Sequence, residues 1–203
     1  MPHAQSLPPG IRIEGHAIVS ADGMIAKADG TMPASLRNDA DWLAFQSAID
    51  RAALVVLGRL GHRNHPNPGR QRLVFTRGVT GFAPDPADPK ATLFNPEGAA
   101  LTEVLGFLGI DSGTIAVTGG TSVFDFFLPV YDAFVLAETQ RLILPGGRPC
   151  FSGAHPHIAL ADAGLAPARF ELIDPAAGVS STDWHRRPGG ELGNWATRSS
   201  NPA

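Results

Sequence analysis

The sequence predicts an α/β fold built around a mainly parallel β-sheet. Short segments rich in β-branched residues alternate along the chain with segments whose apolar residues recur at helical spacing. Such alternation is typical of parallel sheets, because each helix carries the chain back to the start of the next strand. Two of the strand candidates also end in glycine just before a helical pattern, in VVLGR and in IAVTGGTS.

The strand candidates are short and are bounded by turn residues. The last part of the chain differs, because RFELIDPAAGVSSTDWHR reads as two strands joined by a glycine-containing turn. We therefore expect an antiparallel hairpin at one edge of the sheet. The remaining strand candidates are 11–20, 53–57, 71–76, 91–94, 114–118 and 133–137.

Three segments carry helical patterns. In NDADWLAFQSAIDRA, Asn38 is the expected N-cap, and Trp42, Phe45 and Ile49 recur at helical spacing. EGAALTEVLGFLG is the second segment. TSVFDFFLPVY is the third, with Thr121 or Ser122 as its expected cap.

Composition indicates one globular domain. The chain has 203 residues, 43% of them hydrophobic, which is enough for one sizeable core. We expect a single domain over 1–187 and a C-terminal arm or tail over 188–203, where proline and glycine cluster. The net charge of −3 with scattered basic residues does not favour nucleic acid or an anionic membrane as a partner.

The single cysteine bears on the compartment. Cys150 has no partner for an internal disulfide, which fits a reducing environment. The first residues lack the pattern of a secretory signal, and no apolar run is long enough for a membrane span. A cytoplasmic location is the expectation.

Polar residues follow three of the strand candidates, and a parallel sheet would bring them to one edge, where ligands of α/β folds bind. Gly119-Gly120 precedes Thr121 and Ser122 at a helix start, where free N–H groups and the helix dipole favour an anion. Gly58-Arg59 repeats the arrangement with a cation, and Thr76-Arg77 offers a hydroxyl and a guanidinium suited to phosphate. Taken singly, each pair also fits an ordinary turn, cap or surface role.

Two carboxylates open the first predicted helix. Asp39 and Asp41 complement the helix dipole, which is the simplest explanation of both. Asp41 also lies four residues before Phe45, so a carboxylate and an aromatic ring share one helix face. That pair suits a flat heterocycle that bears N–H groups. The histidines lack metal-ligand spacing, so no metal is expected.

Taken in order, these segments resemble the dihydrofolate reductase superfamily, which includes the reductase domain of riboflavin biosynthesis. AIVSADGMIAKADGTMP is similar to the first strand and mobile loop of that family, and DWLAF to the helix with its pocket carboxylate and aromatic residue. VVLGR, PGRQRLVFTR and IAVTGGTSVFDFFLP resemble its cofactor-binding segments. The resemblance runs from Glu14 to Phe151 and implies a three-layer α/β fold. AGLAPARFELI and VSSTDWHRRP look more like the ending of the riboflavin-type reductases.

The resemblance implies NADPH as the cofactor. Thr76 and Arg77 would hold its 2′-phosphate, and a cis peptide is expected between Gly119 and Gly120 under the pyrophosphate. The implied cofactor-binding residues are Ala17, Ile18, Ile25, Gly58, Arg59, Thr76, Arg77, Gly119, Gly120, Thr121, Ser122 and Val123.

The resemblance also implies a substrate pocket. Asp41, or Asp39 as its rival, would be the catalytic carboxylate, and Met32, Phe45 and Arg70 would bind the substrate, with Arg70 holding a carboxylate. The expected reaction is hydride transfer to a C=N bond of a pterin, with dihydrofolate slightly ahead of a phosphoribosylated aminopyrimidine. The riboflavin-type ending further implies pairing of two chains through the hairpin.

The chain departs from the dihydrofolate reductases at several positions. Two extra residues separate Leu36 from Asp41, which is why Asp39 stays a rival. Ala34 replaces a usual tryptophan, and Ala137 a usual pocket threonine. These changes weaken dihydrofolate as the substrate more than NADPH as the cofactor. They also leave open a non-catalytic NADPH-binding protein of the same fold.

Overall fold

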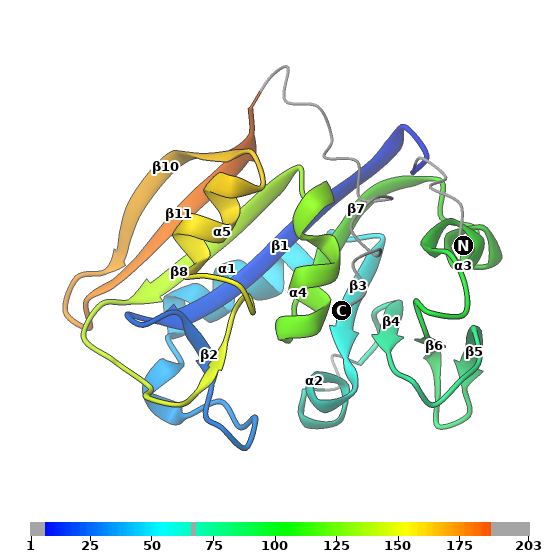
Figure 1. The fold of residues 1–203 in the computed structure, drawn as a ribbon, viewed down its shortest axis with the longest axis horizontal. Coiled ribbons are helices and arrows are strands. Elements are labelled where there is room, and N and C mark those ends of the chain that lie inside the picture. The colour runs from blue at the N-terminus through cyan, green and yellow to red at the C-terminus, as the bar shows by residue number, and fades with distance from the viewer. Residues whose placement is uncertain (1–6, 66–67, 188–203) are drawn as a thin grey trace, which may run out of the picture.

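A computed structural model describes residues 7–65 and 68–187. Within these ranges nine strands form one sheet, in the order β10-β11-β8-β1-β7-β3-β4-β6-β5 (Figure 1). A short ribbon of β2 and β9 lies beside it. The strands are β1 (Gly10–Ser20), β2 (Met24–Ala26), β3 (Leu54–Gly58), β4 (Arg72–Phe75), β5 (Phe82–Asp85), β6 (Asp88–Phe94), β7 (Ser112–Val117), β8 (Ala133–Thr139), β9 (Arg148–Pro149), β10 (Leu165–Asp174) and β11 (Val179–Arg186).

The predicted fold class is confirmed. The run from β8 through β1, β7, β3 and β4 to β6 is parallel throughout. The C-terminal hairpin of β10 and β11 is antiparallel and closes one edge, as expected, while β5 adds an antiparallel strand at the other edge. Sequence patterns missed β2, β5 and β9 because these strands are only two to four residues long.

The helices are α1 (Asp39–Asp50), α2 (Arg59–Asn64), α3 (Leu101–Leu108), α4 (Thr121–Phe127) and α5 (Pro156–Asp162), with 3-10 turns η1 (Ala34–Leu36) and η2 (Leu128–Val130). Asn38 caps α1 as predicted, because its side chain accepts hydrogen bonds from the N–H groups of Ala40 and Asp41. The predicted cap of α4 was wrong. Gly120 occupies the N-cap position without a side-chain bond, and Thr121 is already the first residue of the helix.

Helices cover both faces of the sheet, which gives three layers. In Figure 1, α4 and α5 lie in front of the sheet and α1 lies behind it. The main core joins the front helices to the sheet, for example through Phe124 and Leu160 against Phe134. Behind the sheet, Ile49 of α1 packs on Val55 and Ala116. Because this contact is small, a space is left beside it between α1 and the sheet.

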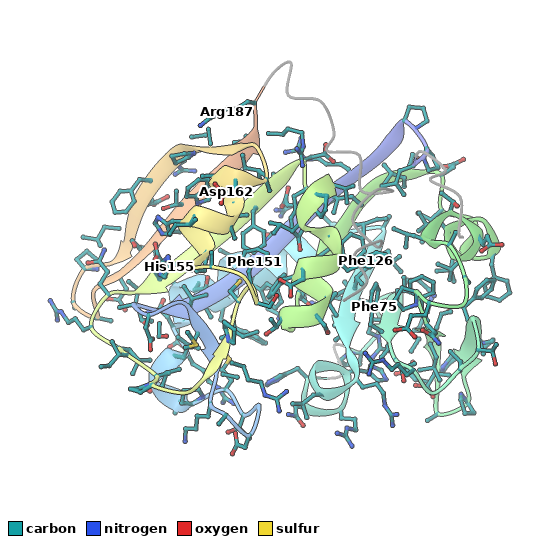
Figure 2. All side chains as sticks on the ribbon, viewed as in Figure 1. Phe75, Phe126, Phe151, His155, Asp162 and Arg187 are labelled. Carbon is teal, nitrogen blue, oxygen red and sulfur yellow. The ribbon has the colours of Figure 1, made fainter. Side chains whose placement is uncertain are left out.

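An aromatic cluster supports the middle of the front face. Phe75 at the end of β4 and Phe126 on α4 lie side by side, with ring centroids 5.2 Å apart (Figure 2). Phe127 and Phe94 contact the same Phe75 ring. These contacts fix the last turn of α4 against the end of β4.

The expected tail, 188–203, lies outside the described residues. Among the described residues, no helix is long and apolar enough to cross a membrane, and no group of three or more acidic, histidine or cysteine side chains is placed to hold a metal ion.

Candidate active site

One large cavity opens at the carboxyl ends of β1, β3 and β7, between the sheet and α1. Its volume is about 1330 Å³. Cavities that hold a single small ligand usually measure about 300–1,000 Å³. This one therefore has room for two ligands side by side. Most of the sequence-predicted residues line it, namely Ala17, Ile18, Ile25, Met32, Asp39, Asp41, Phe45, Gly58, Arg59, Gly119, Gly120, Thr121 and Ser122.

The two strand-to-glycine junctions contact each other in this cavity. The N–H of Gly58 donates a hydrogen bond to the carbonyl of Gly119 at 2.8 Å. The backbone N–H of Thr118 likewise donates to the carbonyl of Val56 at 2.8 Å. The peptide bond between Gly119 and Gly120 is cis, as the resemblance implies. Because both junctions come from parallel strands at the middle of the sheet, they form one backbone-lined wall.

The glycines of this wall differ in what they tolerate. Gly119 has a φ of +94°, and a Cβ there would lie 2.5 Å from the ring of Phe124, so only glycine fits. At Gly120 a Cβ would meet only Ile25, at 3.8 Å. At Gly58 a Cβ would meet nothing closer than 3.7 Å. A Cβ at Gly58 or Gly120 would therefore meet its neighbours at ordinary van der Waals distances, and both residues line the cavity.

The start of α4 supplies the polar part of the wall. The Thr121 hydroxyl donates to the carbonyl of Pro149, which ties the helix start to β9. Ser122 lines the cavity. Val123 does not, because its side chain is buried in the main core and its N–H donates to the carbonyl of Gly120.

Arg59 continues the wall on the first turn of α2. Its guanidinium extends to Gly78 in the loop after β4. Nη1 of Arg59 lies 3.7 Å from the position that a Cβ on Gly78 would occupy. Arg77 is almost fully exposed in the same loop, 3.8 Å from Glu97. Thr76 is buried, and its hydroxyl oxygen accepts a hydrogen bond from the N–H of Gly78 at 3.0 Å. Thr76 therefore shapes the loop. Neither Thr76 nor Arg77 lines the cavity, so of these three expected cofactor-binding residues only Arg59 does.

Asp41 lies at the opposite end of the cavity, on the first turn of α1. Burial raises the pKa of its carboxyl to about 6, although the nearby His16 side chain offsets part of that rise. Asp39 is exposed on the same turn. Phe45, one turn further along, also faces the cavity. The carboxylate and the aromatic ring thus share one helix face, as their spacing predicts.

The sheet floor below Asp41 is polar. Strand pairing places His16 beside Val135 and Val135 beside Asp183, so these three side chains point to the same face. All three line the cavity, as does Glu14, whose Oε1 lies 3.0 Å from Nε2 of His16. The contact with His16 lowers the pKa of Glu14, so this carboxylate stays ionised near neutral pH.

The structure does not bring Arg70 to this cavity. Its guanidinium forms an ion pair with Asp50 at 2.6 Å and donates to the side-chain oxygen of Gln46 at 2.8 Å. Both partners belong to α1, so Arg70 links the approach to β4 with that helix. Ala137 also lies outside the cavity, in a small apolar cluster with Ile18 and Leu36.

Comparison with known proteins places this arrangement in a fold. No protein-family model and no curated protein sequence matches the chain. Solved structures do match. A dihydrofolate reductase of Enterococcus faecalis, complexed with NADP(H) and RAB-propyl, is 17% identical with a TM-score of 0.61, over 87% of this chain and 96% of its own. The chain has a dihydrofolate reductase-like fold.

Two further structures with this fold come from riboflavin biosynthesis. A protein assigned to that pathway in a Shewanella species is 19% identical, with a TM-score of 0.61 over 87% of this chain and 99% of its own. A Thermotoga maritima diaminohydroxyphosphoribosylaminopyrimidine deaminase/5-amino-6-(5-phosphoribosylamino)uracil reductase is 17% identical, with a TM-score of 0.62. The match covers 87% of this chain and 56% of the Thermotoga protein.

Within this dihydrofolate reductase-like fold, sequence reasoning missed the polar floor. His16, Glu14 and Asp183 were not among the expected site residues. Their alternation along β1, with Glu14, His16 and Ile18 on one face, was a usable signal. The alternation could be recognised as part of the site only once the structure showed that this face of β1 lies opposite α1 and Asp41.

Proposed function

We propose that this chain is an NADPH-dependent reductase that transfers hydride to a C=N bond of an amino-substituted heterocycle. One observation carries the proposal. A single cavity joins the backbone wall of Gly58, Gly119 and Gly120 to the raised-pKa carboxyl of Asp41. The cavity is large enough for a dinucleotide and a flat ring to meet between these two ends.

The residues present fit a dinucleotide phosphate. Gly58 and Gly120 line the cavity and carry no side chain, so a pyrophosphate could approach their backbone closely. Arg59 and Arg77 would hold the 2′-phosphate, since guanidinium groups suit phosphate oxygens. Ala17, Ile18 and Ile25 would meet the nicotinamide. Bound NADPH supplies the hydride.

The remaining chemistry belongs to the protein. Asp41, ionised above about pH 6, would accept N–H groups of the ring and raise the proton affinity of the nitrogen to be reduced. A protonated C=N bond accepts hydride more readily, and the proton reaches the nitrogen through water. Phe45 and Met32 would stack on the ring and exclude bulk water from it.

Two substrates remain in contention. Dihydrofolate is the first candidate, because Asp41 and Phe45 share the helix face that suits a pteridine. A phosphoribosylated aminopyrimidine is the second. It is favoured by the pairing of Arg70 with Asp50, which leaves no anchor for a glutamate tail at that position.

The test is NADPH oxidation followed by absorbance, with dihydrofolate in one series and the phosphoribosylated aminopyrimidine in another. The wild type and Asp41→Asn are run side by side, and NADPH binding is measured on both. Turnover that the substitution abolishes supports the proposal and identifies the substrate. NADPH binding without turnover of either compound would instead favour a non-catalytic protein of this fold.

A further inference from the structure

His16 is a polar residue in a place where a sheet floor is usually apolar. It lies in the middle of β1, is only 7% exposed and still lines the cavity. The ring of Phe45 meets it edge-on, with centroids 6.1 Å apart. A buried polar group costs free energy unless a partner satisfies it, so its position calls for an explanation.

The two ring nitrogens of His16 differ in their surroundings. Nε2 is shut off from solvent and lies 3.0 Å from Oε1 of Glu14, although the two groups are not aligned as a hydrogen bond. Nδ1 has no hydrogen-bond partner within residues 7–65 and 68–187, and unlike Nε2 it is not shut off from solvent. Because a carboxylate beside Nε2 favours the proton on that nitrogen, neutral His16 presents Nδ1 as a free acceptor.

We propose that His16 is a substrate-contacting residue whose Nδ1 accepts a hydrogen bond from the ring that Asp41 binds. This inference rests on the proposed reductase function and adds a specificity determinant to it. Glu14 acts as a positioning residue, because its carboxylate lies 3.0 Å from Nε2, favours the proton on that nitrogen and so leaves Nδ1 as the acceptor.

The pairing of His16 with Asp41 defines the class of substrate. An ionised carboxylate accepts hydrogen bonds only, and so does the unprotonated Nδ1. Asp183 adds another acceptor on the floor. The site therefore takes a ring with at least two N–H or O–H donors on the edge that faces α1 and β1. An aromatic ring without such donors would leave these buried acceptors unpaired.

Three substitutions of His16 distinguish the contribution of Nδ1 to substrate binding from that of Nε2. In His16→Asn the side-chain amide is as far from Cβ as Nδ1 is, so an acceptor is kept where we place the contact. In His16→Gln the amide occupies the position of Nε2, and His16→Leu removes both nitrogens while keeping similar bulk. His157→Gln is the matched control, because His157, on α5, contacts Glu138 of β8 and does not line the cavity.

The measurement is the Kd of two probes, dihydrofolate and 5,6-diaminouracil, for the NADPH-loaded protein, with 1,3-dimethyluracil as the ring without N–H donors. We expect a donor-bearing probe to lose about tenfold in affinity in His16→Gln and His16→Leu but about twofold or less in His16→Asn. His157→Gln should bind like the wild type. If His16→Leu does not fold, the difference in affinity between His16→Asn and His16→Gln still tests the inference.

Equal affinity in the Asn and Gln variants, or wild-type affinity in His16→Leu, overturns the inference. It is also overturned if NADPH binds and neither donor-bearing probe does, an outcome that leaves the cofactor half of the proposed function standing. If NADPH does not bind, the proposed function fails. The same titration on the free protein then judges the His16 contact by itself.

Discussion

The N–H of Gly58 donates a hydrogen bond to the carbonyl of Gly119 at 2.8 Å. This bond joins the ends of β3 and β7, and it turns two separate glycine junctions into one continuous surface of backbone. The surface faces a cavity whose far end holds Asp41. The predictions below follow from these two ends and from the groups between them.

Asp41→Asn should lower turnover by about 100-fold or more while leaving NADPH affinity nearly unchanged, because an amide cannot provide the negative charge that the ring N–H groups need. Asp39→Asn, on the same helical turn but exposed, is the control and should keep most of the activity. Steady-state kinetics and NADPH titration check both variants. If Asp39→Asn has the large effect instead, Asp39 is the pocket carboxylate.

Asp41→Asn should also stabilise the ligand-free protein above pH 6. The pKa of Asp41 is about 6 in the folded state, above its ordinary 3.8, so the folded protein binds this proton more tightly than the unfolded chain. The stability contributed by Asp41 is therefore fully present below its unfolded pKa of 3.8 and is lost as the pH rises from there through about 6. Urea unfolding at pH 3 and pH 8 should show a gain for Asp41→Asn on the order of 2 kcal/mol at pH 8 and almost none at pH 3.

Gly120→Ala and Gly119→Ala should fail in different ways. The first adds a methyl group that contacts only Ile25 and projects into the cavity, so stability should stay near that of the wild type while NADPH affinity falls about tenfold or more. The second forces a Cβ into Phe124 at a φ of +94° and should destabilise the fold by roughly 2 kcal/mol or more. Thermal unfolding and NADPH titration of both variants separate the effects. Equal NADPH affinity in Gly120→Ala would contradict the assignment of this wall.

Arg59→Ala and Arg77→Ala should each reduce the preference for NADPH over NADH by about tenfold, since each removes a charge-assisted contact to the 2′-phosphate. The measurement is the ratio of the two Kd values. Arg63→Ala, in the last turn of α2, is the control. An unchanged ratio in both the Arg59 and the Arg77 variant would contradict the placement of the 2′-phosphate at these two arginines.

Local patterns in the sequence predicted the parts of the site that depend on short spacings. The four-residue interval from Asp41 to Phe45 determines a shared helix face, and glycine after a strand indicates where backbone can approach a ligand. The pairing of His16, Val135 and Asp183 depends on register among β1, β8 and β11, which are far apart in the sequence. No short window contains that information.

For Arg70, the sequence predicted the local structure but not the partner of the side chain. The residue follows a Pro-Gly turn and precedes a strand, as expected, but the carboxylate it binds belongs to α1 of the same chain. Thr76 is similar, since a hydroxyl after a strand serves a turn or a ligand equally well, and here it accepts the N–H of Gly78. The residue type was informative in both cases, and its partner was not predictable from the sequence.

A calorimetric titration of the protein with NADPH, repeated with NADH and with Gly120→Ala, tests the central claim most directly. We predict one NADPH per chain, bound more tightly than NADH and more weakly by the variant. No binding of NADPH up to about 1 mM, the upper end of ordinary enzyme KM values, would contradict the assignment of this cavity to a dinucleotide.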